Sequence, residues 1–219
     1  MGRQARAEAT RRKIINAAVG LFDELGYPAT GLGEIIERAE LTKGALYYHF
    51  DSKESLAAAI VDEGSAKLLD TFLNVCQSSS PALESLIHGT LLSAGLIGED
   101  KAVRTGGQLT RALGQFNEAV VRGYGGWYAA VLRQVRQAQA EGDLRDDLDP
   151  DTIAETVQAA MGGAEMMSNA SSGGRDLVAR LIRIWGILLP AIVSGESLPY
   201  FREFLSRASL RHQPPLSIE

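Results

Sequence analysis

The sequence has few of the residues that mark extracellular, membrane or disulfide-bonded proteins. Its one cysteine, Cys76, cannot form an internal disulfide, which favours a reducing compartment and excludes a cysteine-based zinc site. The longest apolar run, residues 184–193, is far shorter than the ~20 residues of a membrane span and contains Gly186 and Pro190. No apolar segment follows the basic N-terminus as it does in a secretory signal. We therefore expect a soluble cytoplasmic protein.

Groups suited to catalysis are also sparse. Histidine occurs only at His49, His88 and His212, without the spacing of metal ligands, and Cys76 has no base beside it in sequence. The acidic residues of segment 146–151 lack the spacing and the glycine of a calcium loop. We expect no catalytic residues, no metal site and no cofactor, and hence a protein that is not an enzyme.

Charge is present but unevenly distributed. Hydrophobic residues make up 45% of the chain and charged residues 22%, as in soluble globular proteins. Residues 1–53 carry a net charge of +1, with +4 concentrated in residues 1–13, whereas residues 54–219 carry −6. A polyanionic partner would therefore meet the N-terminal part, although a solvated basic tail explains the same charges.

Apolar residues recur at helical spacing along the whole chain, for example at Ile14, Ala18, Phe22 and Leu25. We find no strand alternation and no internal repeat. The expected helices cover residues 7–25, 32–39, 43–50, 52–75, 82–97, 101–114, 117–141, 151–169, 175–194 and 198–208. Gly26 should end the first helix, Asp149 and Pro150 should begin the eighth, and Ser171–Gly174 should form a turn. The prediction is an all-α fold.

Segments 32–39 and 43–50 form a candidate helix-turn-helix, whose second helix would enter the DNA major groove. Leu46 and Phe50 lie four residues apart and should pack inward, which leaves a polar and aromatic face outward. The alternative is an ordinary helical core with solvated side chains, but two adjacent outward tyrosines favour a partner. The candidate DNA-binding residues are Thr42, Lys43, Gly44, Ala45, Tyr47, Tyr48, His49, Lys53, Arg3 and Arg6.

Segment 26–56 contains an ordered series of characteristic residues. The series comprises Gly26-Tyr27, Thr30, Leu32, Ile35-Ile36, Ala39, Leu41-Thr42-Lys43-Gly44-Ala45-Leu46-Tyr47-Tyr48-His49-Phe50 and Ser52-Lys53-Glu54-Ser55-Leu56. It strongly resembles the TetR family of transcriptional repressors. The resemblance implies an all-helical homodimer that binds a palindromic operator. It implies a helix-turn-helix domain at residues 1–53 and a larger domain at residues 54–219, which binds a small inducer and mediates dimerisation.

Two residues depart from the family pattern. Gly31 stands where a serine or threonine usually caps the second helix, so no hydroxyl is available for phosphate. Glu40 stands where the turn usually has glycine, and a left-handed backbone there would cost a non-glycine residue about 1 kcal/mol.

The start of the chain and the part beyond residue 56 look like the γ-butyrolactone-receptor branch of actinomycetes. The similarity rests on segment 3–8, Val103-Arg104, Leu109-Thr110, Trp127 and segment 147–149. In that branch the tryptophan lines the inducer pocket, which implies the same role for Trp127 and an inducer such as a γ-butyrolactone or butenolide.

The residues of the larger domain also suggest a ligand site independently of the family resemblance. Aromatic and methionine residues supply a possible apolar interior, namely Phe116, Trp127, Tyr128, Val131, Met161, Met166, Met167 and Trp185. For most of them a plain core role explains the pattern as well, but the indole N–H of a buried Trp127 would need a partner, and Gly123, Gly125 and Gly126 would leave space for one. The candidate ligand-binding residues are Trp127, Met161, Glu165, Gln108, Thr110, Phe72 and Val131.

The last two long helices are expected to form the dimer interface. Gly162 and Gly163 imply the close approach of a helix or a ligand. An apolar stripe on the second of these helices is a plausible contact surface, formed by Leu177, Leu181, Ile184, Leu188 and Ile192.

Two alternatives remain open at the level of function. The first is a multidrug- or metabolite-sensing repressor of the same fold with a different inducer. The second is a helical ligand-binding protein that has lost DNA binding.

Overall fold

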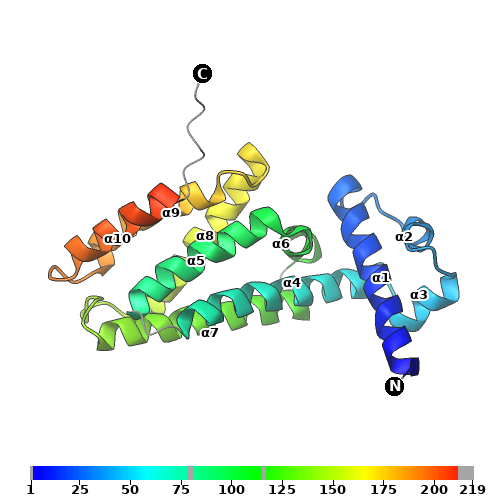
Figure 1. Ribbon diagram of the computed structural model, residues 1–219, viewed down its shortest axis with the longest axis horizontal. Helices are drawn as coiled ribbons and strands as arrows, with labels where there is room; N and C mark the ends of the chain where they lie inside the picture. Colours follow the sequence, from blue (N-terminus) through cyan, green and yellow to red (C-terminus); the bar gives the residue numbers. More distant parts are fainter. Residues whose placement is uncertain (1, 78–80, 115–116, 212–219) are drawn as a thin grey trace. The chain divides into compact units, whose positions relative to one another are not determined.

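The computed structural model describes residues 2–77, 81–114 and 117–211, and this part of the chain is all-α. Its ten helices are α1 (Gly2–Leu25), α2 (Leu32–Arg38), α3 (Lys43–His49), α4 (Lys53–Cys76), α5 (Ala82–Glu99), α6 (Lys101–Leu113), α7 (Glu118–Ala140), α8 (Pro150–Ser172), α9 (Leu177–Ile192) and α10 (Leu198–Arg211) (Figure 1). The all-α prediction is confirmed. Among the described helices, none is long and apolar enough to cross a membrane.

Most helix ends follow the capping signals of the sequence. Gly26 ends α1 with φ +82°, and Gly142 follows α7 with φ +83°. The Asp149 carboxylate accepts the backbone N–H of Thr152 at 3.0 Å, and Pro150 occupies the first turn of α8. The positions of Gly26, Asp149 and Pro150 are the predicted ones, because glycine tolerates positive φ and a short side-chain oxygen satisfies a free N–H.

Two boundaries were predicted wrongly. Helix α1 begins at Gly2 rather than near residue 7, so the basic N-terminal residues belong to a helix instead of a tail. Helix α8 continues through Ser172. The Ser171 hydroxyl donates to the Met167 carbonyl one turn earlier, and the Ser172 hydroxyl donates to the Asp176 carboxylate at 2.6 Å. Arg180 and the hydroxyls of Ser168 and Ser172 hold the pKa of Asp176 far below its ordinary value, so the carboxylate stays charged at this junction.

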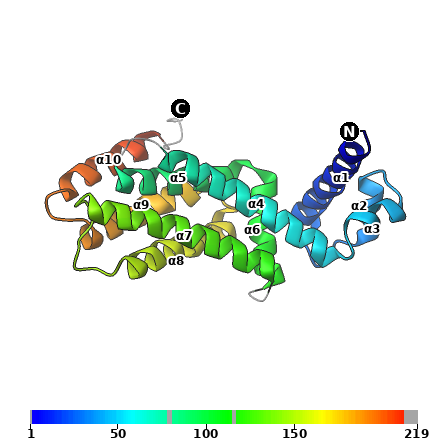
Figure 2. The same cartoon turned by 90° about the horizontal axis from the view of Figure 1, so that it is seen from below.

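The chain divides into two compact units. The first comprises residues 1–68 and 100–125, and the second comprises residues 69–99 and 126–219. Helices α4 and α7 each contribute residues to both units (Figure 2). The first unit therefore contains the three N-terminal helices together with α6 and the beginnings of α4 and α7.

The first unit has its own core of residues from α1, α2, α3, α4, α6 and α7. Ile14, Ala18 and Phe22 of α1 are almost fully buried there, as the helical spacing predicted. Helices α4 and α6 cross closely, since a Cβ atom on Gly106 would lie 3.3 Å from the Ile60 carbonyl oxygen and 3.6 Å from the Cα of Gly64. Asp23 of α1 forms ion pairs with Lys101 and Arg104 of α6, at 3.4 and 3.5 Å. The N-terminal helices are thus attached to α6.

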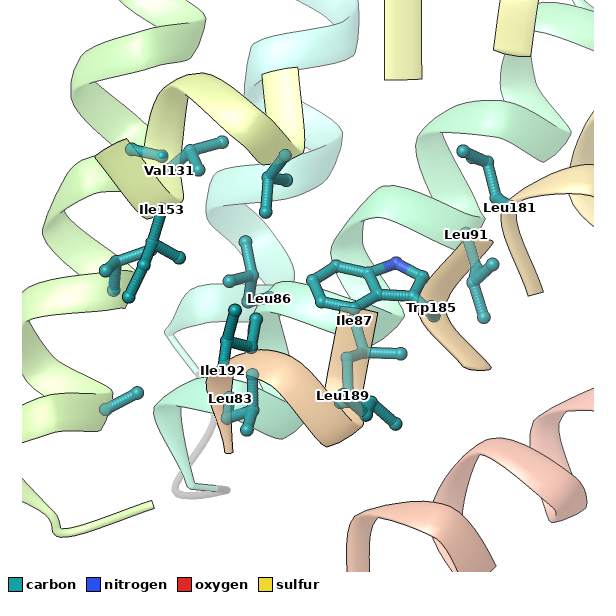
Figure 3. Close-up of a cluster of buried hydrophobic side chains, with 14 of the residues drawn as sticks. Leu83, Leu86, Ile87, Leu91, Val131, Ile153, Leu181, Trp185, Leu189 and Ile192 are labelled. Atoms are coloured by element: carbon teal, nitrogen blue, oxygen red, sulfur yellow. The ribbon is translucent and has the colours of Figure 1, made fainter. Parts of the chain in front are cut away.

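The second unit is centred on Trp185 of α9, which is 2% exposed. Figure 3 shows its indole among Leu86, Ile87 and Leu91 of α5. The indole N–H donates to the Thr90 hydroxyl at 2.9 Å, and that hydroxyl donates to the Ile87 carbonyl at 2.7 Å. This chain of hydrogen bonds satisfies a polar group that would otherwise be buried without a partner.

The predicted contact stripe on α9 faces inward rather than outward. Leu177, Leu181 and Ile192 are buried in the core of the second unit, on the same face as Trp185. Assigning these three residues to the interface was wrong, because the apolar face of an amphipathic helix covers the core of its own subunit first. Ile184 and Leu188 are only partly buried, and their part in an interface stays a prediction. Ile187 lies on the opposite face and is 75% exposed.

Candidate nucleic-acid interface and effector site

Helices α2 and α3 form the predicted helix-turn-helix in the first unit. The Thr42 hydroxyl accepts the backbone N–H of Ala45 at 3.2 Å, so it caps α3 as expected. Leu46 is fully buried and Phe50 is 5% exposed, and these two residues attach α3 to the core. The inner face of the helix matches its predicted spacing.

The outer face of α3 carries cationic and aromatic groups. Tyr47 is 43% exposed and Tyr48 is 74% exposed. The Lys43 ammonium lies 5.8 Å from the centroid of the Tyr47 ring, and the Tyr48 ring contacts His49 edge-on. Lysine and tyrosine side chains on one helical face supply donors both to phosphates and to base edges.

Small residues begin this helix. No atom outside the local backbone lies within 4 Å of a Cβ atom placed on Gly44, and Ala45 adds only a methyl group to the same end. An opposing surface can therefore approach the N-terminal turn of α3 closely, and backbone N–H groups at a helix N-terminus favour an anion.

Lys53 has a role inside the protein that sequence reasoning missed. Its ammonium donates to the carbonyl oxygens of Tyr27 at 2.9 Å and Thr30 at 3.0 Å, and it lies 4.5 Å from the Tyr27 ring centroid. The ammonium thus ties the start of α4 to the connection between α1 and α2. Local sequence offered no signal for this role, because the accepting carbonyl groups lie 26 and 23 residues before Lys53.

The two departures from the family pattern have structural counterparts. The Gly31 N–H donates to the Glu34 carboxylate at 2.8 Å, so the acid in the first turn of α2 completes a cap without a hydroxyl at position 31. Glu40 has φ +54°, the left-handed conformation that a glycine would adopt more easily. Its exposed carboxylate lies between α2 and α3.

Two predicted DNA-binding residues lie near the beginning of α1. Arg6 is exposed on this helix, whereas the side chain of Arg3 lies outside the described part of the structure. The Arg11 guanidinium, further along α1, is engaged with Glu63 of α4 at 2.6 Å.

In the second unit, Trp127 of α7 packs against Phe72 of α4. Their ring centroids are 4.9 Å apart at an angle of 53°. Phe72 is fully buried over Gly89 of α5, where an added Cβ atom would lie 2.6 Å from the phenyl ring. Val131, one turn beyond Trp127, is fully buried, and Met161 of α8 is partly buried against the same core. Four of the predicted ligand-binding residues therefore belong to this core.

The two tryptophans differ in environment. Trp185 is a buried core residue with a satisfied indole, whereas Trp127 is half-buried, and its N–H has no hydrogen-bond acceptor among the described residues. The next residue, Tyr128, donates to Asp151 at 2.7 Å, and this bond together with burial raises the pKa of Tyr128 to about 12. The indole N–H of Trp127 can therefore donate a hydrogen bond to a ligand.

The remaining predicted ligand-binding residues are distributed differently. Glu165 is partly buried on α8 of the second unit. Gln108 and Thr110 belong to α6 of the first unit, where Gln108 is exposed and the Thr110 hydroxyl donates to the Gly106 carbonyl at 3.0 Å. Their part in a ligand site stays a prediction.

Several residues expected in the ligand-binding interior lie elsewhere. Met166 and Met167 are 59% and 57% exposed, so assigning them to the interior was wrong, since successive helical residues cannot all face one core. Gly123 approaches Ser65, where an added Cβ atom would lie 2.8 Å from the hydroxyl oxygen, so it accommodates α4 rather than a ligand. Phe116 lies outside the described residues.

Residues suited to catalysis do not gather in the described part of the structure. No group of three histidine, cysteine or acidic side chains is placed there to hold a metal ion. Burial raises the pKa of Cys76 to about 11, so this thiol is protonated at neutral pH and is a poor nucleophile.

Family models and a sequence relative place this chain in the same protein family. Residues 14–60 match the model of the bacterial regulatory proteins of the tetR family, and residues 102–184 match the model of the tetracyclin repressor-like C-terminal domain. The A-factor receptor protein of Streptomyces griseus is 35% identical over 196 residues, which cover 88% of this chain and 67% of the relative.

Solved structures agree with the sequence comparison. The crystal structure of a gamma-butyrolactone receptor (ArpA-like protein) has a TM-score of 0.74 and 29% identity, over 94% of this chain and 99% of the other. The TetR family protein CprB from Streptomyces coelicolor, in complex with its biological operator sequence, has a TM-score of 0.74 and 30% identity over the same shares. The chain belongs to the TetR family of bacterial transcriptional repressors and, within it, is related to the γ-butyrolactone receptors.

Proposed function

We propose that this repressor binds a palindromic operator as a homodimer and is released by a small, mainly apolar inducer such as a γ-butyrolactone or butenolide. The observation that carries the DNA-binding part is the outer face of α3, where a capped, anchored helix exposes Lys43, Tyr47 and Tyr48. The proposed interface comprises Thr42, Lys43, Gly44, Ala45, Tyr47, Tyr48, His49, Lys53, Arg3 and Arg6. Such activity requires chromosomal DNA, and we therefore propose a cytoplasmic location.

Exposed apolar residues of α8 and α9 support the homodimer. Met166, Met167 and Ile187 are each more than half exposed, and no described atom outside the local helix lies within 4 Å of Cβ atoms placed on Gly162 and Gly163. A twofold interface would cover this surface and present two recognition helices to half-sites about 34–36 Å apart. Residues 54–219 would then form the ligand-binding and dimerisation domain, and residues 1–53 the operator-binding domain.

Operator titrations of single variants test the DNA-binding surface. Lys43→Ala and Tyr47→Ala should each weaken operator binding, while the free energy of unfolding changes by only about ±0.5 kcal/mol because both side chains are exposed. If Lys43 contacts only phosphate, its loss should weaken all DNA sequences alike and reduce the salt slope by about one. Lys67→Ala, on α4 and paired with Asp100, is the control for losing one lysine. Unchanged operator binding in both α3 variants would remove this surface from the interface.

The inducer proposal rests on Trp127, whose indole lies on Phe72 and has an N–H to donate. An inducer with a carbonyl oxygen would accept this N–H while its apolar part contacts the rings. Met161, Val131, Phe72 and Glu165 are the further proposed contacts, and all four lie in the second unit.

A fluorescence titration with a synthetic γ-butyrolactone tests the inducer proposal. The chain has two tryptophans, so ligand stacking on Trp127 should quench part of the emission, and Trp127→Phe should abolish that quenching while Trp185 still emits. Trp127→Ala should lose binding, whereas Tyr124→Ala, an exposed aromatic residue of the same helix, should retain it. Tight binding by Trp127→Ala would refute the site.

The same ligand should bind the protein–operator complex more weakly than the free protein. Linkage requires operator DNA to weaken inducer binding by the factor with which inducer weakens operator binding. Helix α4 is the proposed connection, because one continuous helix contributes Lys53 to the first unit and Phe72 to the second. Equal inducer affinity for both forms would refute the coupling.

Glu40→Gly is expected to strengthen operator binding. Glycine relieves the positive φ, which should raise the free energy of unfolding by up to about 1 kcal/mol, and it removes a carboxylate next to the recognition helix. Glu40→Gln removes the charge but retains the strained backbone, so it should improve operator affinity at low salt without stabilising the protein. Denaturant unfolding and operator titrations at two salt concentrations separate the two effects. Wild-type operator affinity in both variants would show that residue 40 lies away from DNA.

A further inference from the structure

A partly open cavity of about 280 Å³ lies in the groove between helices α5 and α10 of the second unit, and none of its lining residues belongs to the set around Trp127. Figures 1 and 2 show α10 alongside α5. Glu84, His88 and Leu91 line the cavity from α5. Tyr200, Phe204, Arg207 and Ala208 line it from α10.

The spacing of these residues explains the cavity. The α5 residues are three or four positions apart, and Phe204 and Ala208 follow Tyr200 at intervals of four with Arg207 beside them, so each set shares one face. Leu91 is fully buried, and Phe204 and Ala208 are partly buried against the core. Tyr200 and His88 are exposed, as is the Arg207 side chain at 55%. The cavity therefore has an apolar floor and a polar rim, the composition of a small-molecule site.

The charged side chains of the rim indicate which charge a ligand would carry. The Tyr200 hydroxyl donates to the Glu84 carboxylate, and this bond raises the pKa of Tyr200, so the acidic group of the rim already has a donor. Arg207 contacts Glu203 only at 3.9 Å, at the outer limit of an ion pair, and a guanidinium has five N–H donors in a planar fork. A carboxylate matches that fork in two parallel hydrogen bonds.

The volume limits the size of the ligand. At about 280 Å³ the cavity lies just below the usual range for drug-sized molecules, which begins at about 300 Å³. An aromatic ring with a short acid chain is of suitable size, and it would place its ring against Leu91 and Phe204 while its acid reaches Arg207.

We propose that the groove between α5 and α10 is a second binding site, which takes a small aromatic monocarboxylic acid. The carboxylate binds the Arg207 guanidinium at the rim, where the His88 imidazole also lies. The aromatic ring of the ligand packs against the apolar floor. The site is independent of the operator and inducer sites proposed above.

The test uses 3-phenylpropionate, with the neutral 3-phenylpropanol as its matched analogue. Titration into the full-length protein should shift the NMR signals of the His88 imidazole saturably, with a dissociation constant on the order of 1 mM or below for so small a ligand. The neutral alcohol should bind at least about tenfold more weakly, because it lacks the charge that Arg207 recognises.

Variants of α10 then locate the site. Arg207→Gln should weaken binding of the acid at least about tenfold, and Ala208→Phe should abolish it by filling the groove. Arg202→Gln, an exposed arginine of α10 outside the groove, is the matched control and should bind as the wild type does. Thermal melting checks that the variants fold, and Arg207→Gln alters only an exposed side chain.

Two results would overturn the proposal. One is the absence of a saturable His88 shift up to about 10 mM acid, and the other is binding that Arg207→Gln and Ala208→Phe leave unchanged. Operator and butyrolactone titrations on the same variants should match the wild type, so failure of this site is distinguishable from failure of the proposed function.

Discussion

Trp185→Ala is expected to lower the free energy of unfolding by about 3–5 kcal/mol, the loss typical of removing a buried aromatic side chain. The indole is 2% exposed in the centre of the second unit, and its removal leaves a cavity bordered by Leu86, Ile87 and Leu91 (Figure 3). It also leaves Thr90 without its donor. Urea unfolding at a fixed protomer concentration measures the change, because a dimer's apparent stability depends on concentration.

A second variant separates packing from hydrogen bonding at this position. Thr90→Val keeps the shape of the side chain but leaves the Trp185 N–H buried without an acceptor, which should cost about 1–3 kcal/mol. Leu210→Ala, at a residue that is 66% exposed, is the control and should change stability by less than about 0.5 kcal/mol. A loss below about 1 kcal/mol for Trp185→Ala would contradict the packing around the indole.

Local signals in the sequence were sufficient to predict most of the secondary structure and the inner face of α3. Gly26, Thr42 and Asp149 act at helix ends through their own backbone or side chain, so their effect can be deduced without the rest of the fold. Leu46 and Phe50 face inward because of helical spacing alone. These inferences need only neighbours within a few residues.

Inferences that depended on packing between distant segments were less reliable. The apolar stripe of α9 could face either the core or a partner, and periodicity cannot choose between them. Met166 and Met167 have the composition of a core but are exposed, and Gly123 allows α4 to approach instead of a ligand. Lys53 was predicted only as a DNA contact, and the hydrogen bonds that its ammonium donates to carbonyl groups more than twenty residues away in sequence were missed.

The relation between the two tryptophans shows the same limit. Composition indicated an aromatic interior but could not say which indole would find an acceptor. Thr90 lies far from Trp185 in sequence and becomes its acceptor only through the packing of α5 against α9. The structure therefore strengthens the case for Trp127 by accounting for the other indole.

Leu46→Ala is expected to destabilise the first unit by about 2–5 kcal/mol and to weaken operator binding through that loss. Leu46 is fully buried beneath α3, so the smaller side chain leaves a cavity under the recognition helix and raises the population of locally unfolded states. Only molecules with an ordered α3 can bind DNA, so the apparent operator affinity should fall in proportion to the competent fraction.

Temperature distinguishes this effect from the loss of a contact. The operator affinity of Leu46→Ala should recover towards the wild-type value at the temperature of maximum stability, commonly about 10–20 °C, whereas Lys43→Ala should stay weakened there. Hydrogen exchange should show faster exchange of the α3 and α1 amides in Leu46→Ala, since the buried side chain joins these helices to one core. Tyr48→Ala, at a residue that is 74% exposed, is the matched control and should leave stability within about 0.5 kcal/mol of the wild type. If Leu46→Ala exchanged and bound DNA as the wild type does, α3 would not depend on Leu46 for its position, and the anchored recognition helix on which the DNA-binding proposal rests would lose its support.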